Sequence, residues 1–291
     1  MPGKRGLLAP RAPTVPTGAD DPVPFLRGAH VFRIAHLSDL HCGSPHFVAN
    51  LLERAIAEIN ELEPDVIVCS GDLTTHGFRQ EYSEAAGYLA RLECKSMVVV
   101  PGNHDSRNVG YVHFEDHFGD RNSVLHVNGV SLVAVDSSEP DLDHGQIGRG
   151  RYGWIEEQFG KPADFRIFVL HHHLLPVPGT GRERNVVYDA GDTLEALQRA
   201  GVNLVLSGHK HVPYAWRLED IFVVNAGTVS SLRLRGKTRP CYNLIELEGR
   251  HVDVWRKYPF HGQERIIQFS ADTLEFEKYT GRIEREVTTR R

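Results

Sequence analysis

Histidine, aspartate and asparagine residues gather in five short clusters along the chain. These clusters are Asp39-Leu40-His41, Gly71-Asp72, Gly102-Asn103-His104-Asp105, His171-His172-His173 and Gly208-His209-Lys210-His211. Imidazole and carboxylate together suit Zn, Fe, Mn, Co or Ni, and the four cysteines show no paired spacing that would build a competing thiolate site. The clusters therefore predict a metal centre built from nitrogen and oxygen ligands.

Each cluster taken alone has a plain alternative explanation. Asn, Gly and Asp are favoured in ordinary turns, and a histidine pair can be a satisfied or solvated surface feature. The argument for a metal site rests on five clusters in succession, all in the same structural setting. Five other histidines lack that setting and are interpreted as structural or solvated: His30, His113, His117, His126 and His251.

Two metals bridged by a carboxylate would explain this set of residues. Asp72 is the natural bridge, and metals bridged in this way lie about 3.5 to 4 Å apart. Such a pair acidifies a water molecule and stabilises the oxygens of an in-line displacement at phosphorus. Asn103 offers a neutral ligand oxygen, which leaves His104 free to reach a phosphate oxygen or a leaving group.

The elements that must position these clusters are strands, because every cluster follows a short apolar run. The five runs cover residues 31–37, 65–69, 96–100, 165–170 and 203–206. Apolar periodicity predicts helices over residues 47–62, 78–92, 154–159 and 192–200, and further strands over 123–127, 130–135, 214–218, 221–225, 241–247 and 251–255. The carboxyl ends of strands in a helix-flanked sheet form the ligand crevice, so all five clusters can meet at one rim.

The clusters extend from residue 39 to residue 211, and a domain boundary between them would split the site. One domain is therefore expected over residues 30–260, preceded by a mobile leader over 1–29 and followed by a polar C-terminal extension over 261–291, in which 266–269 could add an edge strand. Hydrophobic residues make up 41% and charged residues 24% of the chain, which excludes a disordered or fibrous protein.

Net charge and hydropathy limit the kinds of partner and the location that we expect for the protein. The net charge of -5 is spread along the chain and forms no basic stripe, which argues against polymeric nucleic acid as the partner. No apolar stretch approaches the roughly 18 residues that cross a bilayer. Scattered cysteines and the lack of a signal-peptide core predict a cytoplasmic location, and a homo-oligomer is left open.

The five clusters, in this order, resemble the conserved blocks of the calcineurin-like metallophosphoesterases, over residues 31–255. The resemblance implies an α+β fold, a four-layer αββα sandwich of two mixed β-sheets flanked by helices. It implies one metal on Asp39, His41, Asp72 and His211, and another on Asp72, Asn103, His209 and one histidine of the run 171–173. It also implies that His104 is the catalytic histidine.

The fourth block departs from the family pattern. The family usually has His-x-Pro there, whereas this chain has His171-His172-His173-Leu174-Leu175-Pro176. The spacing after the strand over 165–170 favours His172 as the ligand, with His171 as the alternative.

Several shorter segments resemble the bacterial branch of the family that contains cyclic-nucleotide and glycerophosphodiester phosphodiesterases. These segments are Asp136-Ser137, Gly145, Trp154 and the run from Gly227 to Ser231. The predicted function is therefore hydrolysis of a small phosphodiester, either a 3′,5′-cyclic nucleotide or a glycerophosphodiester, by attack of a hydroxide that bridges two metals (Mn, Fe, Zn or Co). A phosphomonoesterase or nuclease, and a metal-holding binding module without turnover, are the alternatives.

Overall fold

The structure is a computed structural model that describes residues 30–180, 186–235 and 238–279. The leader expected over residues 1–29 and the last part of the expected C-terminal extension lie outside these described residues. No helix within them combines the length and the apolar character needed to cross a membrane.

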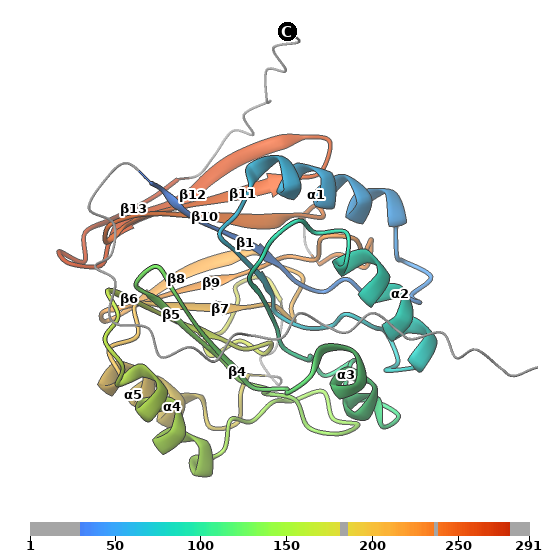
Figure 1. Ribbon diagram of the computed structural model, residues 1–291, viewed down its shortest axis with the longest axis horizontal. Helices are drawn as coiled ribbons and strands as arrows, with labels where there is room; N and C mark the ends of the chain where they lie inside the picture. Colours follow the sequence, from blue (N-terminus) through green and yellow to red (C-terminus); the bar gives the residue numbers. More distant parts are fainter. Residues whose placement is uncertain (1–29, 181–185, 236–237, 280–291) are drawn as a thin grey trace, which may run out of the picture.

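Two mixed β-sheets form the body of the molecule (Figure 1). The seven-stranded sheet has the order β13-β12-β11-β10-β1-β2-β3 and the six-stranded sheet has the order β4-β5-β6-β7-β9-β8. The strands are β1 (Phe32–Leu37), β2 (Val66–Cys69), β3 (Met97–Val99), β4 (Ser123–Val127), β5 (Val130–Ala134), β6 (Phe165–Val169), β7 (Leu204–Ser207), β8 (Tyr214–Leu218), β9 (Ile221–Asn225), β10 (Tyr242–Glu248), β11 (His251–Tyr258), β12 (Gly262–Ser270) and β13 (Phe276–Lys278). Strands β1, β2 and β3 are parallel to one another, and so are β5, β6, β7 and β9.

Helices cover the outer face of each sheet. They are α1 (Ala49–Leu62), α2 (Arg79–Leu89), α3 (Gly110–Phe118), α4 (Tyr152–Phe159) and α5 (Ala190–Arg199), with a short 3-10 turn η1 (Arg149–Arg151) before α4. Helices α1, α2 and α3 pack on the seven-stranded sheet, whereas α4 and α5 pack on the six-stranded sheet on the opposite side of the molecule (Figure 1). This arrangement confirms the predicted four-layer α+β sandwich.

The central strands are buried on both faces, and the alternation of their side chains decides which layer each residue joins. In β6, Phe165, Ile167 and Val169 lie in the core between the two sheets, whereas Phe168 and the following Leu170 pack under α4 and α5. Residues two apart in a strand point to the same face. The side chains that follow a strand therefore inherit their direction from its last residues.

The structure adds helix α3 and strand β13, which were not predicted, and has the longer strand β12 where an edge strand over 266–269 was expected. Helix α3 was not predicted, because it is short and starts directly after a left-handed residue, Val109, without a capping side chain. Beyond residue 260, where the domain was expected to end, β12 pairs with β11 and β13 pairs with β12. Ile267 and Phe269 of β12 are buried in the core between the sheets, so the packed core continues through β12, and β13 is an exposed edge strand.

Candidate metal centre

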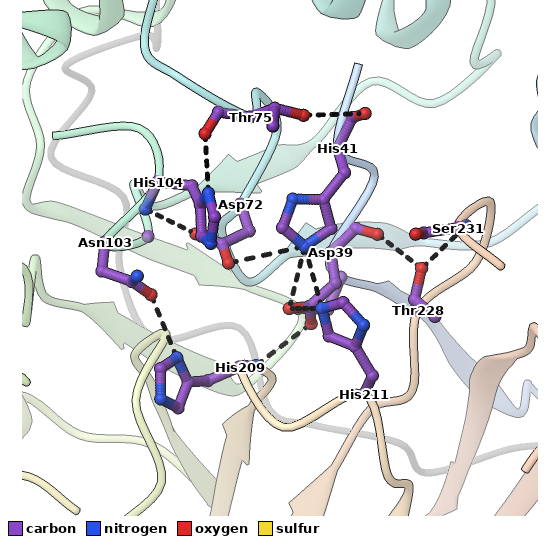
Figure 2. Close-up of polar contacts among 12 residues, drawn as sticks. Asp39, His41, Asp72, Thr75, Asn103, His104, His209, His211, Thr228 and Ser231 are labelled. Carbon is purple, nitrogen blue, oxygen red and sulfur yellow. Dashed lines mark hydrogen bonds and ion pairs between the residues drawn. The ribbon is translucent and has the colours of Figure 1, made fainter. Parts of the chain in front are cut away.

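The five polar clusters lie together, each in the loop that follows a strand. Asp39 follows β1, Asp72 follows β2, Asn103 follows β3, His171 follows β6 and His209 follows β7. The carboxyl ends of parallel strands from both sheets thus converge on one edge of the sandwich, where Figure 2 shows Asp39, Asp72, Asn103 and His209 facing one another. The predicted meeting of the clusters at one rim is what the structure has.

A first group of potential ligands consists of Asp39, His41, Asp72 and His211, all buried. The Nε2 atoms of His41 and His211 lie 2.8 Å apart, and Nε2 of His211 lies 3.2 Å from Oδ1 of Asp39. Oδ2 of Asp72 lies 3.7 Å from Nε2 of His41 (Figure 2). Four potential ligand atoms therefore face a common point.

A second group consists of Asp72, His171 and His209, with Asn103 beside them. Nε2 of His171 lies 3.4 Å from Oδ1 of Asp72 and 3.3 Å from Oδ1 of Asn103. Nδ1 of His209 lies 3.0 Å from the same Asn103 oxygen. Asp72 therefore turns one carboxylate oxygen toward each group, which is the geometry that a bridging ligand needs.

This geometry favours His171 over His172, the residue that the sequence favoured. His172 is buried, but it belongs to neither group, and its Nδ1 lies 2.9 Å from Oγ of Ser137. His171 continues the inter-sheet face of Val169, whereas His172 continues the outer face of Leu170. The structure therefore places His171, the alternative, among the potential ligands of the second group, and places His172 outside it.

The backbone of the ligand loops is unusual. Asp39, His41, Asp72, His209 and His211 all have φ between 53° and 75°, in the left-handed region that non-glycine residues rarely adopt. Asp39 and His41 lie in the loop after β1, outside the strand itself. They reach the same group through a turn with two left-handed residues.

Backbone carbonyls fix the orientation of three histidines. Each Nδ1–H donates to a carbonyl oxygen: His171 to Ser70 at 2.7 Å, His211 to Arg233 at 2.7 Å and His104 to Thr75 at 2.6 Å. This tautomer leaves Nε2 of each ring to face the cluster. Such contacts orient metal-binding histidines and raise their basicity.

Burial and neighbouring charges pull the pKa values of the site in opposite directions. Burial lowers the pKa of His41 to about 3 and holds the pKa of His209 well below its usual range. Burial also opposes protonation of His171, but the adjacent Asp72 carboxylate outweighs it and raises the pKa of that imidazole to about 9. The pKa of Asp72 is held well below its usual range because the nearby His171 and His104 offset the effect of burial.

The donor set fits a pair of cations. Oδ1 of Asp39 is buried without a hydrogen-bond partner, and the ligand atoms of each group lie within 4.8 Å of one another. A buried carboxylate oxygen without such a partner is costly unless an ion compensates its charge. Imidazole nitrogens, carboxylate oxygens and one amide oxygen are ligands that Zn, Mn, Fe and Co accept.

His104 lies beside the two groups without belonging to either. Its backbone N–H donates to Oδ1 of Asp72 at 3.0 Å, and its ring meets the edge of the His41 ring with centroids 4.8 Å apart. The side chain is partly exposed, in contrast to the buried ligand candidates. A partly exposed imidazole at this position can contact a bound substrate.

Two residues that support the site were not assigned this role from the sequence. The buried carboxylate of Asp105 accepts hydrogen bonds from the backbone of Leu73, Thr74 and Gly102, and so joins the loops after β2 and β3. Thr228 donates its hydroxyl to the carbonyl of Asp39 at 2.6 Å. The clusters Gly102-Asn103-His104-Asp105 and Gly227 to Ser231 contain these residues, but the residue types alone do not reveal such contacts.

Two glycines permit the close approach of these loops. A side chain at Gly208 would overlap Ser38 and Asp39, and one at Gly102 would overlap the carboxylate of Asp72. The glycine that precedes a ligand in these clusters is therefore a steric requirement of the site.

Comparisons with known proteins agree with this geometry. The family model described as calcineurin-like phosphoesterase matches residues 32–213. The chain therefore belongs to the calcineurin-like phosphoesterase family, a family of metal-dependent hydrolases.

Individual relatives lie in the bacterial branch that the sequence resembles. A probable cyclic nucleotide phosphodiesterase of Synechococcus sp. is 26% identical over 197 residues, which cover 64% of this chain and 76% of that protein. A cAMP/cGMP dual specificity phosphodiesterase of Mycobacterium tuberculosis is 30% identical over 167 residues, or 54% of this chain, and the match spans 49% of that protein's length.

Solved structures agree on the fold. A dimetal phosphatase from Danio rerio superposes with a TM-score of 0.63 at 11% identity, covering 81% of this chain and 98% of that one.

Proposed function

We propose that the protein hydrolyses small phosphodiesters, either a 3′,5′-cyclic nucleotide or a glycerophosphodiester, at a centre of two metal ions. The observation that carries the proposal is the Asp72 carboxylate, whose two oxygens face the two ligand groups, with His104 beside it. The names of the Synechococcus and Mycobacterium relatives support a diester as the substrate.

Asp39, His41, Asp72 and His211 would hold one metal, and Asp72, Asn103, His171 and His209 the other. When bound, the two metals supply Lewis acidity, which makes water a nucleophile near neutral pH and stabilises the charge that develops at phosphorus. Asp72 would fix the distance between the two metal positions, and the buried histidines exclude bulk water from them.

His104 would act on the substrate itself. With Nδ1–H held by the carbonyl of Thr75, Nε2 is the ring atom available to contact a phosphate oxygen or to protonate the departing oxygen. A positioned acid of this kind contributes roughly 10² to 10⁴ in rate.

The test is reconstitution of metal-free protein with Mn, Zn, Fe or Co, followed by assays on bis(4-nitrophenyl) phosphate, 4-nitrophenyl phosphate, cyclic AMP and glycerophosphocholine. We expect the diesters to be cleaved with a higher kcat/KM than the monoester. A preference for 4-nitrophenyl phosphate would instead establish a phosphomonoesterase. Two bound metals without turnover of any substrate would establish a metal-holding binding module.

A further inference from the structure

We propose that Thr75 is the positioning residue of His104, and that Glu81 holds the Thr75 peptide in place for that task. The inference rests on the proposed phosphodiesterase function, because the role of His104 is part of that function. It concerns two residues that belong to neither ligand group.

The first observation is the contact between Thr75 and His104. The Nδ1–H of His104 donates to the carbonyl oxygen of Thr75 at 2.6 Å, which fixes both the tautomer and the plane of the ring (Figure 2). During cleavage the oxygen of a hydroxide ion forms a bond to phosphorus as the bond from phosphorus to the leaving oxygen breaks. The leaving oxygen takes the Nε2 proton of a doubly protonated His104 ring to form an alcohol, which leaves the neutral ring. His104 keeps its Nδ1 proton on Thr75, so the carbonyl determines which nitrogen transfers the proton.

The second observation is that the Thr75 peptide is held from two other sides. Its hydroxyl donates to the carbonyls of Cys42 at 3.0 Å and His41 at 3.2 Å. Its backbone N–H donates to Oε2 of Glu81 at 3.3 Å. In Figure 2, Thr75 spans the gap between His104 and the backbone of His41. The Thr75 carbonyl shares its peptide plane with the N–H of His76, which donates to Oε2 of Glu81, so the carbonyl cannot rotate away from the imidazole without breaking that hydrogen bond.

Glu81 secures the whole turn that contains Thr75. Its Oε2 also accepts the backbone N–H groups of His76 at 2.8 Å and Phe78 at 3.3 Å. Glu81 is 8% exposed, and its side chain lies against Gly43, where an added Cβ would overlap it. A buried carboxylate with several backbone donors is a rigid anchor, since charge-assisted hydrogen bonds are stronger than neutral ones.

The matched pair of variants is Thr75→Val, which removes the hydroxyl donor at nearly constant shape, and Thr75→Ser, which keeps it. We expect Thr75→Val to lower kcat by about 10- to 100-fold, the usual effect of losing such a supporting contact, with KM and metal content unchanged. Thr75→Ser should restore kcat to near the wild-type value. If Thr75→Val loses metal instead, Thr75 acts through the carbonyl of His41 and the proposal is wrong.

A double-mutant cycle with His104→Ala tests whether Thr75 acts through His104, because the effects of substitutions at coupled residues are not additive. In the His104→Ala background, Thr75→Val should change kcat by less than about twofold. The control is Thr228→Val, which removes a comparable threonine donor that binds the Asp39 carbonyl and should lower kcat by the same factor in both backgrounds. Additive losses for Thr75→Val would overturn the proposal.

A measurement without substrate separates this inference from the proposed function. In zinc-loaded protein, the hydrogen-bonded Nδ1–H of His104 should give a protected proton resonance that is absent from His104→Ala. We expect Thr75→Val to shift or broaden it and Thr75→Ser to retain it, and an unshifted resonance in Thr75→Val would contradict the proposal even if every phosphodiester assay failed. Thr75→Ala, which removes the same donor without the bulk of valine, repeats the test if Thr75→Val does not fold.

Discussion

The two halves of the candidate metal centre differ in charge although they share Asp72. The first half, with Asp39, His41 and His211, has two carboxylates, whereas the second half, with Asn103, His171 and His209, has the shared carboxylate and a neutral amide. Attraction for a cation grows with the charge of its ligands. We therefore expect the first half to bind its metal more tightly and the second half to exchange its metal more readily.

The largest effect is expected from removing the residue that the two halves share. Asp72→Ala should abolish phosphodiesterase activity and empty both positions, because the two cations lose their common ligand and the charge that screens them from each other. Elemental analysis of the purified protein measures this. Asp253→Ala, which removes a carboxylate on β11 outside both ligand groups, is the control and should keep both metals. Retention of two metals by Asp72→Ala would rule out the bridge.

The next effect should be confined to the second half. His171→Ala should lose that metal and most of the activity while the first half stays loaded, because Nε2 of His171 faces Asp72 and Asn103. His172→Ala is the matched neighbour, and its ring is held by Ser137 outside both groups. Metal analysis of the two variants side by side decides the assignment, and greater metal loss from His172→Ala would restore the original preference.

Exchanging a charged for a neutral ligand tests whether ligand charge causes the difference in metal affinity between the two halves. Asn103→Asp should tighten the second position by about tenfold and Asp39→Asn should weaken the first by about the same factor, because the number of charged ligands tunes metal affinity. Calorimetric titration of metal-free protein should show two binding steps in the wild type. In either variant the steps should move closer together. Two steps that stay equally far apart would show that charge is not the source of the asymmetry.

The smallest effect is expected on folding rather than on metal binding. Asp105→Asn replaces one acceptor oxygen by a donor amide facing the backbone N–H groups of the loops after β2 and β3. We expect a loss of about 2 kcal/mol in the free energy of unfolding, measured by urea denaturation, with both metals retained. A variant as stable as the wild type would mean that Asp105 does not hold the loops after β2 and β3 together.

The sequence predicted most of the central strands and the position of every cluster, because apolar runs and strand-end polar residues are local signals. It favoured His172 over His171 because both faces of β6 carry buried apolar residues, so the alternation does not show which face meets the other sheet. The sequence also could not predict the hydrogen bonds of His104, His171 and His211 to backbone carbonyls, because any residue can supply a carbonyl. Strand β12 was underestimated because its polar residues alternate with the buried Ile267 and Phe269.

The left-handed backbone of Asp39, His41, Asp72, His209 and His211 has a consequence for how this protein can change. Non-glycine residues in this conformation each cost about 1 to 3 kcal/mol, and glycine or asparagine would adopt it more cheaply. A laboratory selection for thermal stability alone would therefore favour glycine or asparagine at these positions and would erase the centre. Only a selection that also demands turnover would keep aspartate and histidine there. The residues found at these five positions after selection would therefore show whether stability or activity was favoured.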